Sequence, residues 1–215
     1  MQTLADIKTA VYALGYEDDQ SARVTVLANS VQREILNDNR WRFAVVSANV
    51  PAVAGVAVYA LPAAPPVHHI ESVRLSTPGA TYRELTATDS DDLLELAAYG
   101  GSDDGAQVWT ELSTTTFQVY PAPQLAGTFT VRYLRTAPDL AADADVPLVP
   151  AEYLDIVVLG VAAYLAARER QWEAVDRFRT EKEKLMGRMK AQYGLKQRQS
   201  SARVAYSGQR QYGEY

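Results

Sequence analysis

The side chains that could do chemistry in this sequence are mainly carboxylates, because the alternatives are scarce. The chain has no cysteine and only two histidines, the adjacent pair His68 and His69. Without cysteine, thiol nucleophiles, disulfides and thiolate metal sites are excluded. Neighbours on a strand point to opposite faces, so the two histidines cannot easily hold one metal ion. We interpret them as surface or strand-edge histidines.

Acidic residues gather in three clusters: Asp89, Asp91 and Asp92; Asp103 and Asp104; and Asp139, Asp143 and Asp145. The first cluster precedes an apolar run and predicts a helix cap. The second lies in a glycine-rich loop and predicts a solvated turn. The third has a spacing that could bind a cation, but it lacks the glycine and the closing glutamate of a calcium loop. A glycosidase-like carboxylate pair stays open, although nothing in the sequence favours it.

Motifs for phosphate, dinucleotide or nucleophile chemistry are missing from the sequence. It contains no phosphate-binding loop, dinucleotide fingerprint or nucleophile elbow. Gly100-Gly101-Ser102 holds a lone glycine pair with no helix-opening pattern behind it. We therefore predict a protein that is not an enzyme and that has no catalytic, cofactor-binding or metal-binding residue.

The stretch with the strongest core pattern is 150–193. Pro150, with Glu152 and Asp155 close behind, predicts the start of a helix. Residues 153–167 are apolar on nearly every side, which is typical of a buried helix. This run is shorter than the roughly 20 residues of a membrane span. From Arg168 onward an amphipathic stripe follows at helical spacing: Trp172, Val175, Phe178, Lys182, Leu185, Met189 and Tyr193.

Two more helices are predicted before residue 40. The first covers 3–14, and Thr3 with Asp6 matches a capping box. The second has Ser21 as its cap and ends near Asn37. The apolar stripes of both helices need a partner, so we expect the two ends of the chain to pack together.

The sequence between these helical ends follows strand patterns. Strands are predicted at 43–50, 56–62, 69–75, 82–86, 107–110, 115–120 and 128–135, with a short helix at 93–99. Ala54-Gly55 predicts a hairpin between the first two strands. The predicted fold class is α+β. A helical bundle forms from 1–40 and 150–193, a mainly antiparallel β module is inserted at 41–149, and a flexible tail covers 194–215.

Charge is distributed unevenly along the chain. Residues 1–150 hold 9 Lys and Arg against 18 Asp and Glu, whereas residues 151–215 hold 12 against 8. A basic end on an acidic body indicates that the end has its own partner. The tail is poor in aliphatic residues, which predicts disorder in isolation. Its arginines and tyrosines are residue types that anchor interfaces.

Several short phrases occur in order across residues 3–193. They are Asn39-Arg40-Trp41-Arg42-Phe43, Tyr59-Ala60-Leu61-Pro62, Ile70-Glu71-Ser72-Val73, Val119-Tyr120-Pro121-Ala122-Pro123, Val131-Arg132-Tyr133, the run from Val146 to Tyr153, and the run from Tyr164 to Glu169 followed by Trp172-Glu173-Ala174. In this order and spacing the sequence resembles the head-to-tail adaptor (connector) proteins of tailed bacteriophages, in the family shared by short-tailed phages and related prophages.

The resemblance implies a structural virion protein of the head-tail junction, made in the bacterial host cytoplasm. About twelve copies would form a ring beneath the portal protein through heterologous contacts. The ring would line the DNA channel and meet further tail or connector proteins below. DNA would pass only as cargo, because an acidic body does not grip phosphates. The resemblance implies no catalysis, no cofactor and no membrane partner, and it implies a helical turn near Arg168–Gln171.

Two sets of residues follow as candidates for these contacts. The portal-binding candidates lie in the tail: Arg198, Arg203, Tyr206, Arg210, Tyr212 and Tyr215. The subunit-interface candidates lie on the mixed-charge helix: Arg168, Arg170, Glu173, Arg177, Glu181, Lys184 and Arg188. Removing 195–215 should abolish portal binding.

Two other classes stay open. The β module could be a ligand- or carbohydrate-binding module or an Asp/Glu-dependent hydrolase, which requires a pocket with converging carboxylates of shifted pKa. Alternatively, the basic residues of 168–190 could bind DNA, which requires binding with a steep salt dependence. The acidic residues interleaved with them indicate a solvated, salt-bridged helix face instead.

Overall fold

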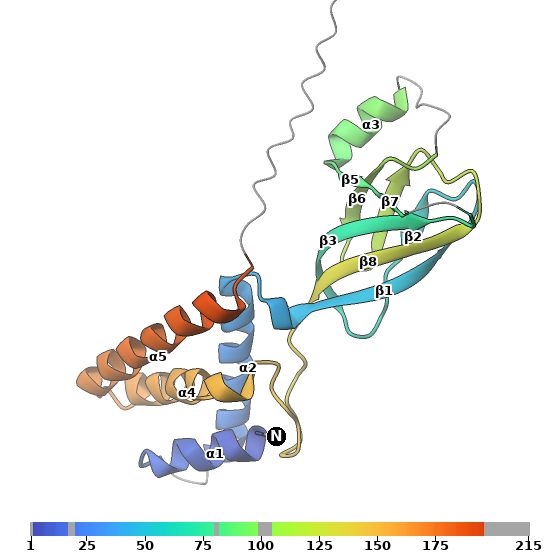
Figure 1. The fold of residues 1–215 in the computed structure, drawn as a ribbon. Helices are drawn as coiled ribbons and strands as arrows, with labels where there is room; N and C mark the ends of the chain where they lie inside the picture. Colours follow the sequence, from blue (N-terminus) through green and yellow to red (C-terminus); the bar gives the residue numbers. More distant parts are fainter. Residues whose placement is uncertain (1, 17–19, 80–81, 99–104, 196–215) are drawn as a thin grey trace, which may run out of the picture.

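The computed structural model describes residues 2–16, 20–79, 82–98 and 105–195 of the chain. The fold class is α+β, as predicted. Helices from both ends of the chain form one unit, and the strands between them form a second unit beside it (Figure 1). Of the helices in the described ranges, none combines the length and hydropathy that a membrane crossing requires. The predicted flexible tail lies outside the described residues, apart from Gly194 and Leu195.

In the described part of the chain, four helices form the first unit: α1 (Leu4–Ala13), α2 (Ser21–Asp38), α4 (Asp155–Arg168) and α5 (Trp172–Tyr193). α4 is buried on most sides, as its composition predicts. The stripes of the other three helices pack around it. The shared core consists of Leu4, Ile7 and Val11 from α1, Val24, Ala28, Val31 and Ile35 from α2, Ile156, Val157, Val161 and Leu165 from α4, and Val175, Phe178 and Met189 from α5.

Gly160 of α4 lies directly against Val31 of α2. A Cβ added at Gly160 would lie 2.6 Å from a methyl group of Val31, whereas a Cβ at Gly187 of α5 would meet nothing within 4 Å. Gly160→Ala is therefore expected to lower the free energy of unfolding by about 1–3 kcal/mol through overpacking. Gly187→Ala should raise it by about 0.5–1 kcal/mol, because alanine favours a helix. Urea unfolding of the two variants measures the opposite signs, and equal shifts would contradict this packing.

Several predicted helix boundaries change in the structure. Pro150 does not start the long helix, because bonds of the i→i+3 type form the 3-10 helix η3 (Ala151–Tyr153) before α4 begins. Ser21 is the first residue of α2 rather than its cap. The carboxylate half of the predicted capping box of α1 is confirmed, since the backbone N–H of Thr3 donates to Asp6 at 2.7 Å.

The predicted turn near Arg168–Gln171 is confirmed, and its geometry explains why the periodicity did not reveal it. The N–H of Gln171 donates to the carbonyl of Ala166 at 2.9 Å, and the N–H of Arg170 donates to Ala167 at 3.2 Å. This pattern is a Schellman motif, which usually has glycine at its left-handed residue. Here Arg170 takes that place at φ 61°. The chain therefore turns without the glycine signal that ends many helices.

Within the described residues, the second unit contains two sheets of four strands each. One sheet has the order β1-β8-β3-β4 and the other β2-β7-β6-β5. The strands are β1 (Val45–Ala52), β2 (Val58–Ala60), β3 (Val67–Ser76), β4 (Arg83–Glu84), β5 (Thr86–Ala87), β6 (Val108–Ser113), β7 (Thr116–Tyr120) and β8 (Gly127–Arg135). All described pairings are antiparallel except β5 with β6. The short helix α3 (Ser90–Ala98) lies at the end far from the helical unit (Figure 1).

The two sheets pack face to face around aromatic side chains. Tyr59 of β2, Phe117 of β7 and Phe129 of β8 bring their ring centroids within 4.7–5.6 Å of one another. Alternating residues of β8, including Val131 and Tyr133, point into the same core. The residues between them, such as Arg132, therefore point outward from the sandwich.

The predicted hairpin at Ala54-Gly55 is wrong. β1 pairs with β8 and β2 pairs with β7, so this turn carries the chain from one sheet to the other. The Tyr59 hydroxyl holds the crossing segment: it donates to the Val56 carbonyl at 2.8 Å, and it accepts from the Val53 N–H at 3.2 Å. Glycine signals a turn, but it does not identify the strand that pairs afterwards.

The two units meet at residues 39–45, where Trp41 is completely buried. Its indole N–H donates to the Ile35 carbonyl at 2.7 Å, and its ring stacks on Phe43 with centroids 5.5 Å apart. Beside it, Arg40 binds both carboxylate oxygens of Glu71 in β3. These contacts tie the end of α2 to the 3-10 helix η2 (Arg42–Ala44) and to the first sheet.

Candidate interaction surfaces

The residues considered for catalysis or metal binding are held apart in the structure. His68 and His69 are both exposed, as predicted, and Nδ1 of His69 lies 3.3 Å from a carboxylate oxygen of Glu111. Within the described ranges, no three His, Asp or Glu side chains converge on a point that could hold a metal ion. Asp103, Asp104 and Gly100-Gly101-Ser102 lie outside the described residues. Asp91 and Asp92 occupy the first turn of α3, and Asp89 precedes this helix.

Asp139, Asp143 and Asp145, whose spacing suggested a cation, each have a different partner. Asp139 pairs with Arg33, and Asp143 lies 2.6 Å from the ammonium of Lys8. Asp145 accepts the N–H groups of Ala141 and Ala142 at 2.7 Å each, and these two bonds lower the pKa of its carboxyl. The three carboxylates therefore stabilise the connector from β8 to α4.

Two side-chain amides of α2 hold this connector, a contact that was not predicted from the sequence. Both ends of the Asn29 amide bond the backbone of Leu140, at 2.9 and 2.8 Å. The Gln32 side chain, which is fully buried, donates to the Pro138 carbonyl at 2.9 Å and accepts from the Leu148 N–H at 2.7 Å. An isolated polar residue in an apolar stripe was the available signal, because buried amides need partners.

The subunit-interface candidates lie at the turn before α5 and on α5 itself. Arg168 and Arg170 are exposed at the turn before α5. The five on α5 are all exposed and recur at spacings of four, four, three and four residues: Glu173, Arg177, Glu181, Lys184 and Arg188. This spacing places them on one stripe of the helix, separate from the buried stripe. We call these five residues the α5 stripe.

Bonding within the α5 stripe is sparse. Lys184 and Glu181 form an ion pair at 2.7 Å, and the Arg177 guanidinium lies 5.0 Å from the centre of the Phe178 ring. Trp172, which the amphipathic pattern placed in the buried stripe, is instead 63% exposed at the start of α5. The helix therefore presents a charged stripe and an exposed aromatic ring to its surroundings.

The C-terminal end of α5 is fixed at the junction between the two units. Gly194 forms an isolated β-bridge with Trp41, and the Leu195 N–H donates to the Arg40 carbonyl at 2.8 Å. The Tyr193 hydroxyl donates to the Glu152 carboxylate, which lowers the pKa of Glu152 and raises that of Tyr193. The portal-binding candidates from Arg198 to Tyr215 lie outside the described residues. Gly194 and Leu195, which precede them, are held at the junction.

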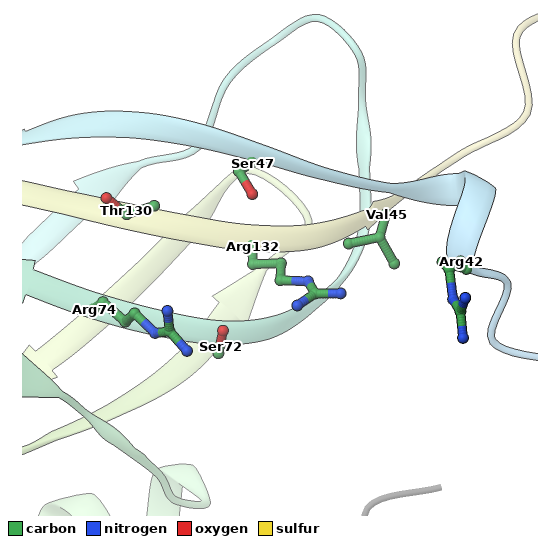
Figure 2. A pocket seen from close by; sticks show the side chains of 7 residues that line it. All are labelled: Arg42, Val45, Ser47, Ser72, Arg74, Thr130 and Arg132. Carbon is green, nitrogen blue, oxygen red and sulfur yellow. The ribbon is translucent and has the colours of Figure 1, made fainter. Parts of the chain in front are cut away.

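A second feature that the sequence analysis missed is a hollow of about 360 Å³ on the outer face of the first sheet. Figure 2 shows its lining: Arg42, Val45, Ser47, Ser72, Arg74, Thr130 and Arg132. The hollow is lined by guanidinium and hydroxyl groups and has no carboxylate in its lining. The converging carboxylates that a hydrolase would need are thus not found in this part of the β module.

The arrangement defines a class of fold: an α+β protein in which a helical unit carries a β sandwich and exposes charged surfaces. Comparison with known families then assigns the chain. The model of the SU10 adaptor protein family matches residues 2–210, and the chain belongs to that family. Membership is consistent with a phage head-to-tail adaptor, so the resemblance seen in the sequence is confirmed at this level. This family is structural and is not an enzyme class. A search of the curated proteins finds no match.

Proposed function

We propose that the protein forms a ring at the head-tail junction of a tailed phage, beneath the portal and around the path of the DNA. Family membership supports the adaptor role. The observation that carries the proposal is the geometry of α5, whose exposed charged stripe ends at an anchored C-terminus. One helix could then serve both the neighbouring copy and the portal.

The α5 stripe fits a contact between copies because of its composition and exposure. It carries two Glu and three Lys or Arg residues, so a heterologous contact can match unlike charges on the next copy. The exposed Trp172 adds an aromatic anchor of the kind that interfaces use. Arg168 and Arg170 extend the same surface around the turn.

The contact with the portal is assigned to the tail. The bonds of Gly194 and Leu195 to residues 40–41 fix the last described residues at the junction between the two units. The tail would then extend its arginines and tyrosines to the portal from a fixed origin. Ordering on the partner would suit a segment poor in aliphatic residues.

Charge reversal on the α5 stripe is expected to prevent ring completion. In the double variant Arg177→Glu with Arg188→Glu, each contact loses attraction of about 0.2–1 kcal/mol per exposed pair and gains repulsion. The loss repeats at every contact around a ring, so portals should carry fewer copies. Native mass spectrometry of the portal complex counts them.

The matched control reverses two charges of the same sign in the β module, in Arg83→Glu with Arg132→Glu. It should leave the copy number unchanged. Complete rings formed by the α5 variant would show that copies meet through another surface.

A further inference from the structure

We propose that the hollow on the outer face of β1, β8 and β3 binds the backbone phosphates of duplex DNA. The site is defined by Arg42, Arg74 and Arg132, which we call the arginine patch. Its role during DNA passage rests on the proposed function, but phosphate binding by the patch can be measured without it. The acidic composition of the body predicts DNA only as passing cargo. The patch would add a contact with DNA at one defined place.

Strand register places the arginine patch on one surface. Arg132 of β8 is opposite Ser47 of β1 on one side and Ser72 of β3 on the other. Arg74 of β3 is opposite Thr130, two residues along β8. Paired residues share a face of the sheet, so all five side chains point away from the buried core. Figure 2 shows the guanidinium groups of Arg74 and Arg132 on the same side of the sheet, with Arg42 beyond Val45.

The concentration of positive charge here contrasts with the rest of the module. Residues 41–149 hold five arginines, no lysine, and 12 Asp and Glu, which gives a net charge of −7. Three of those five arginines line this one hollow. Arg74 lies 3.5 Å from a Glu84 oxygen in an exposed pair. Across the described ranges, Arg42 and Arg132 have no carboxylate partner within ion-pair distance.

The chemistry of the lining favours phosphate over a protein partner. Guanidinium groups present several N–H donors in a fixed plane that matches phosphate oxygens. Ser47 and Ser72 add hydroxyl groups of the kind that contact the DNA backbone. An interface with a protein segment would need an apolar centre. The described lining of the hollow contains one aliphatic side chain, the half-buried Val45, among polar neighbours. Polar, strongly basic surfaces are typical of contacts with DNA.

The surrounding acidity gives the patch a specific consequence. Carboxylates repel the DNA backbone over most of the module, so contact would be confined to the patch. Three phosphate contacts carry no sequence information and give weak, salt-sensitive binding. Such a contact would position DNA without holding it.

The test measures binding of a fluorescein-labelled, mixed-sequence DNA duplex to the full-length protein over a range of salt concentrations. The three phosphate contacts of the patch should contribute about −2.7 to the slope of log K against log salt. In Arg42→Gln with Arg132→Gln, the slope should become shallower by about 1.8, and binding at low salt should weaken roughly tenfold. The matched control, Arg23→Gln with Arg83→Gln, removes two exposed arginines outside the patch and should change neither value.

Two results would overturn the proposal. Equal losses in the patch variant and the control would indicate a diffuse charge effect. Unchanged DNA binding in the patch variant, together with weaker binding to a polyglutamate peptide, would assign the patch to an acidic protein segment instead. The basic tail is intact in every protein compared, so its contribution cancels. Failure to bind the portal would refute the adaptor proposal and leave this measurement standing.

Discussion

Truncation after Leu195 is expected to abolish the complex with the cognate portal protein. The cut removes every portal-binding candidate but retains the bond from Leu195 to Arg40 and the bridge from Gly194 to Trp41. Arginine and tyrosine anchors contribute about 2 kcal/mol each where they are buried in an interface. Loss of only two would weaken binding roughly thousandfold. Biolayer interferometry on immobilised portal measures this change.

Two controls separate a binding role of the tail from a folding role. The truncated protein should unfold at the same temperature as the full chain, because the anchored residues remain. A full-length variant with Tyr206→Ala, Tyr212→Ala and Tyr215→Ala should lose most of the affinity while keeping the length of the tail. If the truncated protein binds the portal as tightly as the full chain does, the assignment of the tail is wrong.

Replacing Trp41 by alanine is expected to lower the free energy of unfolding by about 3–5 kcal/mol. The side chain is completely buried, stacks on Phe43 and donates to the Ile35 carbonyl. Its removal leaves a cavity at the junction of the two units and deprives a buried carbonyl of its donor. Urea denaturation followed by circular dichroism measures the loss.

The chain offers its own control for this substitution. Trp172 is 63% exposed, so Trp172→Ala should change the free energy of unfolding by less than about 0.5 kcal/mol. Trp41→Phe should fall between the two, because it restores part of the volume without the N–H. Similar losses from Trp41→Ala and Trp172→Ala would contradict the junction described here. If folded Trp41→Phe binds the portal weakly, the junction at Trp41 positions the start of the tail for portal binding.

Local pattern was sufficient for most elements of the fold. Helical stripes and strand alternation depend only on the spacing of nearby residues. They therefore predict a helix or strand even where its packing partner is distant in the sequence. The turn after Arg168 could not be predicted from periodicity. Arg170 occupies the left-handed position of the Schellman motif, where glycine would have signalled the end of the helix. Trp172 fits the apolar spacing of α5, yet the turn places it at the exposed start of the helix. At Gly55 the turn was predictable, but the partner of each flanking strand depends on how the two sheets pack.

The candidate surfaces also differ in whether they depend on local pattern or on tertiary structure. The α5 stripe follows from helical spacing and was visible in the sequence. The arginine patch is formed by residues from three segments that strand register brings together, with Arg42 and Arg132 far apart in the sequence. The bonds of Asn29 and Gln32 to the connector also depend on tertiary structure, since their partners lie more than a hundred residues away.

Electron microscopy of the full-length protein mixed with its cognate portal tests the adaptor role most directly. We expect a ring of additional density beneath the portal, with the helical units in contact through α5 and continuous density from each α5 end to the portal. The protein need not form a ring alone, so a monomer in isolation is compatible with this result. Portal particles without added density, at protein concentrations that saturate other contacts, would contradict an adaptor function for this chain.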